Sequence, residues 1–348
     1  MNVLAPKVSI VVIARNEERT IGKCVSSLIE QDYPAFEMIF VDSDSCDRTM
    51  ELVQSISKGL RPLILLSDRG GSAASARNKG LSVARGEVVA FVDGDCFFDR
   101  DWLKKSVDYL RDGKRDNIAG VGGPYMQVPN VQSPVSRVIS SVESTKLAGA
   151  SSAEKRVSAR AKYVKGLSLC GAVFWTTVLA RAGPFDNMLQ YCEDSEFCYR
   201  VRSLGFKLLC AADLGAYHTP KYGSIRSFAK KMWNYGVGRG QAIRLNKHLF
   251  TWFGLVSLAC SVLFVALSFA GFALGFPEPG LVAILMLMLY LATVSAFSVK
   301  VAIKIGSIEA FFLAATSYLA LHIPYTGGLL VGMLIPGNRT KSRGAGLP

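Results

Sequence analysis

The sequence predicts an α/β domain with a mostly parallel, Rossmann-like sheet, followed by a C-terminal region of transmembrane helices. One observation is that apolar, β-branched runs alternate with helical patterns at the start of the chain. Another is a change in composition at Leu249, beyond which the chain holds only two acids and two lysines up to Ile335. Apolar strands separated by helices are typical of parallel sheets covered on both faces, and long uncharged stretches are typical of membrane spans.

The elements of the α/β domain, which we place at residues 1–222, follow in order. Short apolar runs predict four strands, at residues 8–14, 38–41, 62–66 and 88–92. Ile21, Val25 and Leu28 share one face of a helical pattern over residues 18–30, and a second helix is expected over residues 73–84. The patterns over residues 113–165 are less regular. We therefore expect a doubly wound sheet with helices on both faces.

A basic segment, residues 223–248, follows the α/β domain. Apolar side chains recur in it at helical spacing from Ile225 onward. The cations that fall on its other faces are Arg226, Lys230 and Lys231. This pattern predicts a basic amphipathic helix at a membrane surface, which the glycines at 236, 238 and 240 are expected to end. The alternative is an ordinary surface helix packed on the domain.

The membrane region is placed at residues 249–337 and a short tail at residues 338–348. Its three apolar stretches cover residues 250–274, 281–303 and 309–335. Each is long enough to cross the ~30 Å hydrocarbon core of a bilayer as a helix. The alternative is a set of buried core helices in a larger soluble protein.

Charge and export signals bear on partners and location. The chain carries a net charge of +13, and no acid lies between Leu214 and Pro277. Basic residues beside a span suit anionic lipids or phosphorylated ligands, so we expect a lipid membrane and no nucleic acid as partner. No cleavable signal precedes the first strand, so the α/β domain is expected in the cytosol, at the cell (plasma) membrane. The eight cysteines show no zinc-ligand spacing and are expected to be reduced and mostly buried.

The orientation of the spans is left open by the charge pattern. Lys300 and Lys304 place the loop after the second span inside. Three spans would then put the tail outside, whereas the cations of the tail favour the inside. Pro324 offers one resolution, because it could mark a broken or re-entrant third segment.

Polar clusters follow three of the predicted strands. They are Arg15-Asn16-Glu17, Asp42-Ser43-Asp44 and Asp93-Gly94-Asp95. Ligands of open α/β sheets bind outside the carboxyl ends of the strands. The three clusters therefore predict one ligand crevice.

The Asp93-Gly94-Asp95 cluster has the chemistry of a metal site. Two carboxylates separated by one small residue can surround a divalent cation, and Mg²⁺ or Mn²⁺ prefers such oxygen ligands together with phosphate oxygens. A Ca²⁺ loop over residues 42–51 is excluded because Asp47 stands at its required glycine position. Residues 70–72 lack the Gly-Lys-Ser/Thr ending of a phosphate loop, and no strand leads into the glycines of residues 236–240.

Five motifs in order carry a resemblance to a known family. They are Val-Ser-Ile-Val-Val-Ile-Ala-Arg-Asn-Glu-Glu, Val-Asp-Ser-Asp-Ser-Cys-Asp-Arg-Thr, Ala-Arg-Asn-Lys-Gly, Phe-Val-Asp-Gly-Asp and Glu-Asp-Ser-Glu-Phe-Cys-Tyr-Arg. In this order they resemble glycosyltransferase family 2, over roughly residues 7–245. The resemblance implies a GT-A fold, and the C-terminal spans look like those of the membrane-anchored bacterial and archaeal branch of succinoglycan-type enzymes.

The resemblance also implies a donor site. The residues implied to border the nucleotide-sugar are Ala14, Arg15, Glu17, Asp42, Asp44, Arg77, Gly80 and Asp93. Within this set Asp42 would contact the base, and Gly80 would allow a close approach. Asp93 and Asp95 would hold Mg²⁺ or Mn²⁺, with His218 completing the metal site, although a lone histidine is as often structural. Lys230 and Lys231 are candidates to meet the departing diphosphate or a lipid phosphate.

On the acceptor side, Glu193 and Asp194 match the acidic pair of the family, with Asp194 as general base. A carboxylate in reach of an acceptor hydroxyl suits inverting transfer. The alternative is a charged first helical turn, where acids favour the helix dipole. The Gln-x-x-Arg-Trp motif of processive members is absent, which favours transfer of a single sugar.

The function predicted is therefore that of an inverting, metal-dependent glycosyltransferase of polysaccharide or glycoconjugate biosynthesis. It would move one sugar from a UDP- or GDP-sugar to a saccharide acceptor, polyprenyl-linked in the main expectation. Two alternatives stay open: a polyprenyl-phosphate sugar synthase, and a membrane scaffold without catalysis. The sugar, the base, the linkage and the oligomeric state are not predicted.

Overall fold

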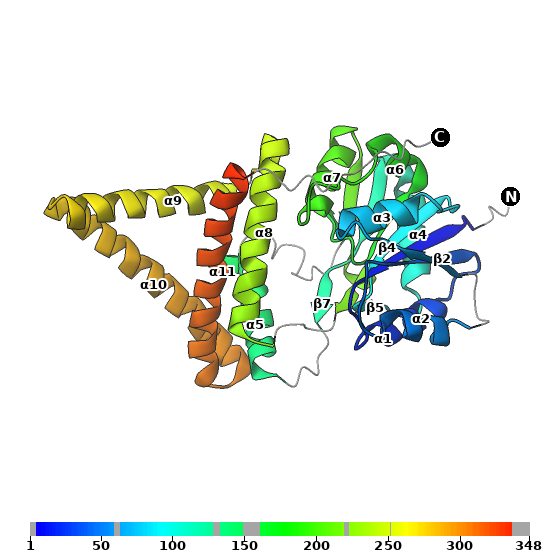
Figure 1. The fold of residues 1–348 in the computed structure, drawn as a ribbon, viewed down its shortest axis with the longest axis horizontal. Coiled ribbons are helices and arrows are strands. Elements are labelled where there is room, and N and C mark those ends of the chain that lie inside the picture. The colour runs from blue at the N-terminus through cyan, green and yellow to red at the C-terminus, as the bar shows by residue number, and fades with distance from the viewer. Residues whose placement is uncertain are drawn as a thin grey trace. The chain divides into compact units, whose positions relative to one another are not determined.

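The chain forms two compact units in the computed structural model (Figure 1). The structure describes residues 5–58, 63–127, 133–148, 161–218, 223–250 and 252–335. The first unit, which we call the α/β unit, comprises residues 1–128, 156–219 and 337–348. The second, the helical unit, comprises residues 129–155 and 220–336. The predicted tail, residues 338–348, lies outside the described residues.

The α/β unit is built on an eight-stranded sheet, which confirms the predicted fold class. Its strand order is β3-β2-β1-β4-β9-β6-β10-β8. The first four strands are parallel neighbours: β1 (Val8–Ala14), β2 (Phe36–Asp42), β3 (Leu63–Ser67) and β4 (Val88–Asp93). The other half contains β6 (Ile118–Gly122), β8 (Lys162–Val164), β9 (Ala172–Trp175) and β10 (Lys207–Cys210), with β9 antiparallel to β4 and β6. All four predicted strands are present; β1, β2 and β4 are buried on both faces of the sheet, and β3 is a half-buried strand at its edge.

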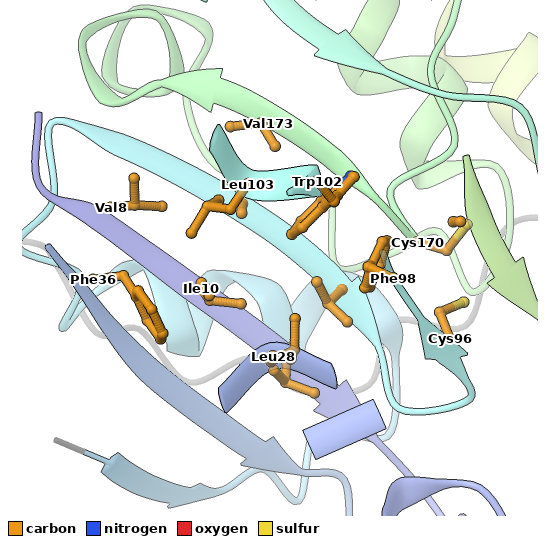
Figure 2. Close-up of a cluster of buried hydrophobic side chains, with 14 of the residues drawn as sticks. Val8, Ile10, Leu28, Phe36, Cys96, Phe98, Trp102, Leu103, Cys170 and Val173 are labelled. Atoms are coloured by element: carbon orange, nitrogen blue, oxygen red, sulfur yellow. The ribbon is translucent and has the colours of Figure 1, made fainter. Parts of the chain in front are cut away.

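Helices cover both faces of this sheet. Alternate residues of β1 point in opposite directions, so Val8 and Ile10 join one buried cluster and Val11 and Ile13 the other. The first face is covered by α1 (Ile21–Ile29) and α4 (Trp102–Asp112), and Figure 2 shows Leu28 and Trp102 of these helices in that cluster. The other α-helices of this unit are α2 (Thr49–Ile56), α3 (Ala73–Leu81), α6 (Thr176–Ala182) and α7 (Glu193–Ser203).

A small second sheet lies beside the main one. It consists of β5 (Cys96–Phe97), β11 (Ala216–His218) and β7 (Tyr125–Gln127), in the order β5-β11-β7. The pairing of β5 with β11 puts His218 opposite Cys96. Residues far apart in sequence therefore meet directly after Asp95.

The helical unit contains α5 (Pro134–Glu143), α8 (Ile225–Leu245), α9 (Trp252–Ser268), α10 (Pro277–Ile305) and α11 (Glu309–Leu334), with a π-helical turn at Phe269–Ala273 after α9. Within the described residues, two segments are long and apolar enough to cross a membrane, Val256–Ala273 and Pro277–Ile305. They coincide with the first two predicted spans. The third predicted span forms α11, and its crossing of the membrane stays a prediction.

Two expectations fail in the helical unit. The glycines at 236, 238 and 240 do not end α8, which continues to Leu245. Gly236 and Gly240 lie against the backbone of α11, so close packing outweighs their low helix propensity. The segment around α5 was also expected to belong to the α/β domain, yet Val138, Ile139 and Val142 pack with Tyr318 of α11 in a buried cluster of the helical unit.

Candidate active site

The register of the sheet brings the predicted polar clusters to one edge. Ala14 at the end of β1 pairs with Asp42 at the end of β2, and Ile13 pairs with Asp93 at the end of β4. Because these strands are parallel, all three carboxyl ends lie together. The structure therefore brings the predicted strand ends together.

Hydrogen bonds lock the loop after β1 to the loop after β2. The Asn16 amide donates to Ser45 Oγ at 2.9 Å, and the Cys46 amide donates to Asn16 Oδ1 at 2.8 Å. The Glu17 amide donates to Thr49 Oγ1 at 2.7 Å. Arg15 and Asp44 stand exposed on these loops. The two loops thus form one fixed rim beside Asp42.

Two buried carboxylates at this edge each keep one acceptor without a partner. Asp42 and Asp68 are both 6% exposed. Asp42 Oδ2 accepts from the Ser45 amide at 3.1 Å, and Asp68 Oδ1 accepts from Ser75 Oγ at 2.9 Å. Asp42 Oδ1 and Asp68 Oδ2 have no hydrogen-bond partner in the part of the chain that the structure describes. A buried acceptor is costly to leave unpaired, so both oxygens suit donors on a ligand.

Asp68 was missed by the sequence reasoning. It follows the third strand directly, as Asp42 follows the second, and its amide donates to the Asp42 carbonyl at 2.7 Å. A polar residue after each predicted strand was the signal that could have found it.

Arg77 links two sides of the site. Its side chain, 4% exposed, reaches from α3 to Asp93 Oδ1 at 2.9 Å and to Glu193 Oε1 at 2.5 Å. Burial alone would lower the pKa of Arg77, but the charges of Asp93 and Glu193 raise it. The guanidinium therefore stays charged and holds α7 to the end of β4.

The acidic pair at the start of α7 has two different environments. Glu193 is buried, and this burial, with the nearby Asp194 charge, raises the pKa of Glu193 to about 7 even though Arg77 lowers it. One guanidinium that is shared with Asp93 does not fully offset the burial of Glu193. Asp194 is only half-buried, and its Oδ1 accepts from the Ser195 amide at 2.6 Å. Of the two, Asp194 is the carboxylate that solvent reaches more readily.

Gly80 does not have the predicted role. A Cβ at Gly80 would collide with the Val11 side chain on β1. The close approach that this glycine permits is therefore that of α3 to the sheet, not that of a ligand.

Asp95 and His218 form the candidate metal centre. Both are buried, and Asp95 Oδ2 lies 2.7 Å from His218 Nε2. The Tyr125 ring lies against the imidazole, with centroids 4.6 Å apart. A carboxylate oxygen and an imidazole nitrogen side by side are a donor set that a divalent cation such as Mn²⁺ accepts.

Cys96 completes a cluster of three potential ligands with Asp95 and His218. A hydrogen bond with the Cys170 thiol and burial raise the pKa of Cys96, which keeps it a thiol. Figure 2 shows Cys96 and Cys170 in the same buried cluster. Asp93 lies outside this cluster and is held by Arg77 instead.

Residues 9–166 of the chain match Glycosyl transferase family 2. Over this range the chain is similar to a family 2 glycosyltransferase domain. The matched range includes both loops, Arg77 and the Asp93-Gly94-Asp95 motif, whereas Glu193 and His218 lie beyond it.

Two relatives match most of the length of this chain. The glycosyltransferase AglE of Haloferax volcanii is 28% identical over 246 residues, which cover 70% of this chain and 76% of AglE. A dolichyl N-acetyl-α-D-glucosaminyl phosphate 3-β-D-2,3-diacetamido-2,3-dideoxy-β-D-glucuronosyltransferase of Methanococcus voltae is 25% identical over 271 residues, covering 75% of this chain and 82% of that protein.

A solved structure shows the same fold. The mannosyltransferase of Pyrobaculum calidifontis, solved with GDP-Man and Mn²⁺, has a TM-score of 0.60 and 22% identity to this chain. The match covers 90% of this chain and 87% of that structure. The expected GT-A fold is thereby confirmed, and the roles assigned to single residues stay predictions. Lys230 and Lys231, on α8 of the helical unit, are among them.

Proposed function

We propose that this glycosyltransferase moves one sugar, with inversion, from a nucleoside-diphosphate sugar to a saccharide carried on a polyprenyl lipid, at the cytosolic face of the plasma membrane. The observation that carries the proposal is the meeting of Asp42, Asp93 and Asp95 at one edge of the sheet, with Arg77 and His218. The edge offers acceptors for a nucleoside and donors for a cation in one place.

On the donor side, Asp42 would accept from the base, and the rim of the two locked loops would border the nucleoside. The buried acceptor Asp42 Oδ1 supports this role. Arg77 would fix Asp93 beside the ribose and the diphosphate. Asp95 and His218 would hold Mg²⁺ or Mn²⁺, which when bound would neutralise charge on the leaving diphosphate.

On the acceptor side, Asp194 would take the proton of the attacking hydroxyl. A general base of this kind contributes typically ~10²–10⁴-fold to the rate. Its half-buried carboxylate at the N-terminus of α7 supports the role. Glu193, buried against Arg77, would fix the start of the helix on which Asp194 stands.

A lipid-linked acceptor is supported by two observations. The two apolar helices of the helical unit are candidate membrane spans. The name of the Methanococcus voltae relative describes an acceptor on a dolichyl phosphate. A sugar chain on a membrane lipid is the acceptor class that joins both observations.

The proposal is tested by nucleotide release from the purified full chain in detergent. UDP- and GDP-sugars are incubated with Mn²⁺, with Mg²⁺ or with chelator, and Asp95→Ala and His218→Ala are compared with the exposed control Asp116→Ala. We expect release from one class of donor, lost with chelator and lowered roughly 10²-fold or more in the two site variants. Release that is indifferent to chelator would contradict the metal site, and calorimetry showing that no donor binds with metal would contradict the transferase.

The alternative acceptor, a bare polyprenyl phosphate, is already ionised and needs no base. Asp194→Asn distinguishes the two: a loss of kcat with an unchanged donor KM supports the saccharide acceptor, and near-normal turnover supports the phosphate. A chain that binds donor without turning it over would be the scaffold.

A further inference from the structure

In the helical unit, α8 and α11 are in backbone contact over their C-terminal parts. Gly236 and Gly240 of α8 lie against backbone atoms of α11, and Gly328 and Gly332 of α11 lie against backbone atoms of α8, with no room for a Cβ at any of these positions. Residues from Trp233 to Arg244 of α8 contact residues from Tyr325 to Leu334 of α11, and the residue numbers increase together along the two helices. The two helices therefore lie side by side and run in the same direction (Figure 1).

The composition of α8 excludes it from the core of a bilayer. Its cations recur from one end to the other: Arg226, Lys230, Lys231, Arg239 and Arg244. Each such charge costs about 2.5–3.5 kcal/mol at the centre of a spanning helix. Because α11 lies along α8, a membrane-crossing α11 would carry these cations into the hydrocarbon with it.

The other two helices contact α11 over different lengths. Ser257, near the start of α9, hydrogen-bonds with Thr326 of α11 at 3.1 Å. The second half of α10 packs against the first half of α11, where Tyr290 Oη lies 3.0 Å from His322 Nδ1, and α10 ends at Ile305, shortly before α11 begins at Glu309. The far ends of α9 and α10 touch, since Gly271 packs against Gly280. Residues 309 and 326 of a helix are about 26 Å apart. α9 and α10 therefore form the two legs of a hairpin, and α11 runs from the foot of α9 to the foot of α10, with the second half of α10 packed against it (Figure 1).

The exposed apolar side chains are distributed differently on the hairpin and on α11. Large apolar groups cover both legs, among them Val265, Phe272, Leu285 and Leu289. On α11 the exposed apolar residues share one face: Phe312, Ile323, Leu330 and Leu334. The exposed apolar face of α11 and the cations of the adjacent α8 together give this helix pair the apolar and basic sides that are typical of helices lying in a membrane surface.

The tip of the hairpin carries an acid. Glu278, in the first turn of α10, is exposed. A carboxylate is costly at the centre of a bilayer, so the tip reaches the opposite head groups rather than stopping midway. At the foot of the same leg, Lys300 and Lys304 lie near the end of α10.

We propose that the chain crosses the membrane twice, as the α9–α10 hairpin, and that α8 and α11 lie together on the surface where the hairpin enters, against anionic lipid head groups. The spans are then even in number, so the end of α11 returns to the side of α8. This resolves the conflict between three spans and a basic tail, and it does not depend on the sugar chemistry.

The first test fuses a reporter after Pro348 of the full chain in a bacterial inner membrane. Green fluorescent protein matures in the cytosol and alkaline phosphatase outside it, and the same reporters placed before Met1 mark the side of the α/β unit. We expect fluorescence without phosphatase activity at both ends. Phosphatase activity at the C-terminal end alone would establish three spans and overturn the proposal, as would equal signals from both reporters.

The second test measures depth along α11. Spin labels at Phe312, Ile323 and Leu334, in a full chain whose other cysteines are replaced, report the distance from the head groups in vesicles of mixed anionic and zwitterionic lipid. A surface helix gives three similar depths, whereas a spanning α11 puts Ile323 deepest, between ends about 33 Å apart. A protein that stays soluble and dimeric without detergent would mean that a second copy, not lipid, covers the legs.

Discussion

Arg77 and Glu193 show how single residues connect the two halves of the site. A buried guanidinium between two carboxylates ties α3 to the end of β4 and to the first turn of α7. The donor-side Asp93 and the proposed base, Asp194, thereby share one support. Such a network is also easily destabilised, because the loss of one charged side chain leaves the others buried without a partner.

Replacing Arg77 by Met is expected to destabilise the α/β unit by about 3–5 kcal/mol, because Glu193 and Asp93 lose their counter-charge. The stability of Arg77→Lys should lie between that of the wild type and that of Arg77→Met, since one ammonium group cannot bridge both acids. Thermal unfolding of the full chain in detergent measures the effect. The double variant Arg77→Met/Glu193→Gln is the control, and it should recover part of the loss; if it recovers nothing, the ion pair is not the cause.

The raised pKa of Glu193 gives a pH dependence with a definite sign. Its usual value is 4.5 and its value in the folded chain is about 7, so between these the native state holds a proton that the unfolded state has lost. This contribution to stability is complete at low pH and declines as pH rises through the window. Relative to that of Glu193→Gln, the free energy of unfolding of the wild type should fall by on the order of 2 kcal/mol between about pH 5 and about pH 7.5.

The measurement is chemical unfolding of both proteins at the two pH values. Glu87→Gln, which removes an exposed carboxylate, is the matched control. A difference between wild type and Glu193→Gln that stays constant with pH would contradict a raised pKa.

At the scale of elements, close packing decides where helices run. Gly80 lets α3 approach β1, and Gly236 and Gly240 let α8 approach α11. In α8 the glycines would weaken an isolated helix by roughly 1 kcal/mol each relative to alanine. The helix persists because its partner occupies the space that side chains would need.

Gly236→Leu is therefore expected to separate α8 from α11. Its Cβ would meet the Tyr325 carbonyl, which belongs to the backbone and cannot turn aside. Overpacking of this kind costs typically about 1–3 kcal/mol, and the thermal midpoint of the full chain should fall accordingly. Gly223→Ala, which places a Cβ in open space, should leave it almost unchanged. Equal midpoints for the two variants would argue against the helix pair.

The whole molecule combines an α/β unit that carries the candidate site with a helical unit that carries the two candidate membrane spans. The net charge of +13 and the acid-free stretch from Leu214 to Pro277 bias it toward anionic surfaces. The charge that matters most is the part on α8, because a polybasic segment gains about 1 kcal/mol per cation near an anionic membrane.

Nanodiscs with anionic lipid should therefore stabilise the full chain more than zwitterionic ones do. The gain should shrink as salt is added, because exposed charges are screened over about 8–10 Å at physiological ionic strength. The triple variant Arg226→Gln/Lys230→Gln/Arg244→Gln should lose most of the gain. Thermal midpoints in the two lipids measure it, and a gain that survives in the triple variant would place the lipid contact elsewhere.

The sequence by itself determined the four parallel strands, the strand-end clusters, the family resemblance and the long apolar stretches that form α9 and α10. These rest on local patterns: apolar runs for Val8–Ala14 and Val88–Asp93, ordered motifs, and helices long enough to cross a bilayer. The predicted helix at residues 73–84 is likewise present as α3.

Only the tertiary structure decided the rest, because it depends on contacts between distant residues. Arg77 reaches Glu193 across 116 positions, and β11 brings His218 to Asp95. Asp68 joins the site through β3 beside β2, and α5 joins the helical unit through α10 and α11. The glycines of α8 predict a helix end when read locally, and only the presence of α11 turns them into a packing surface.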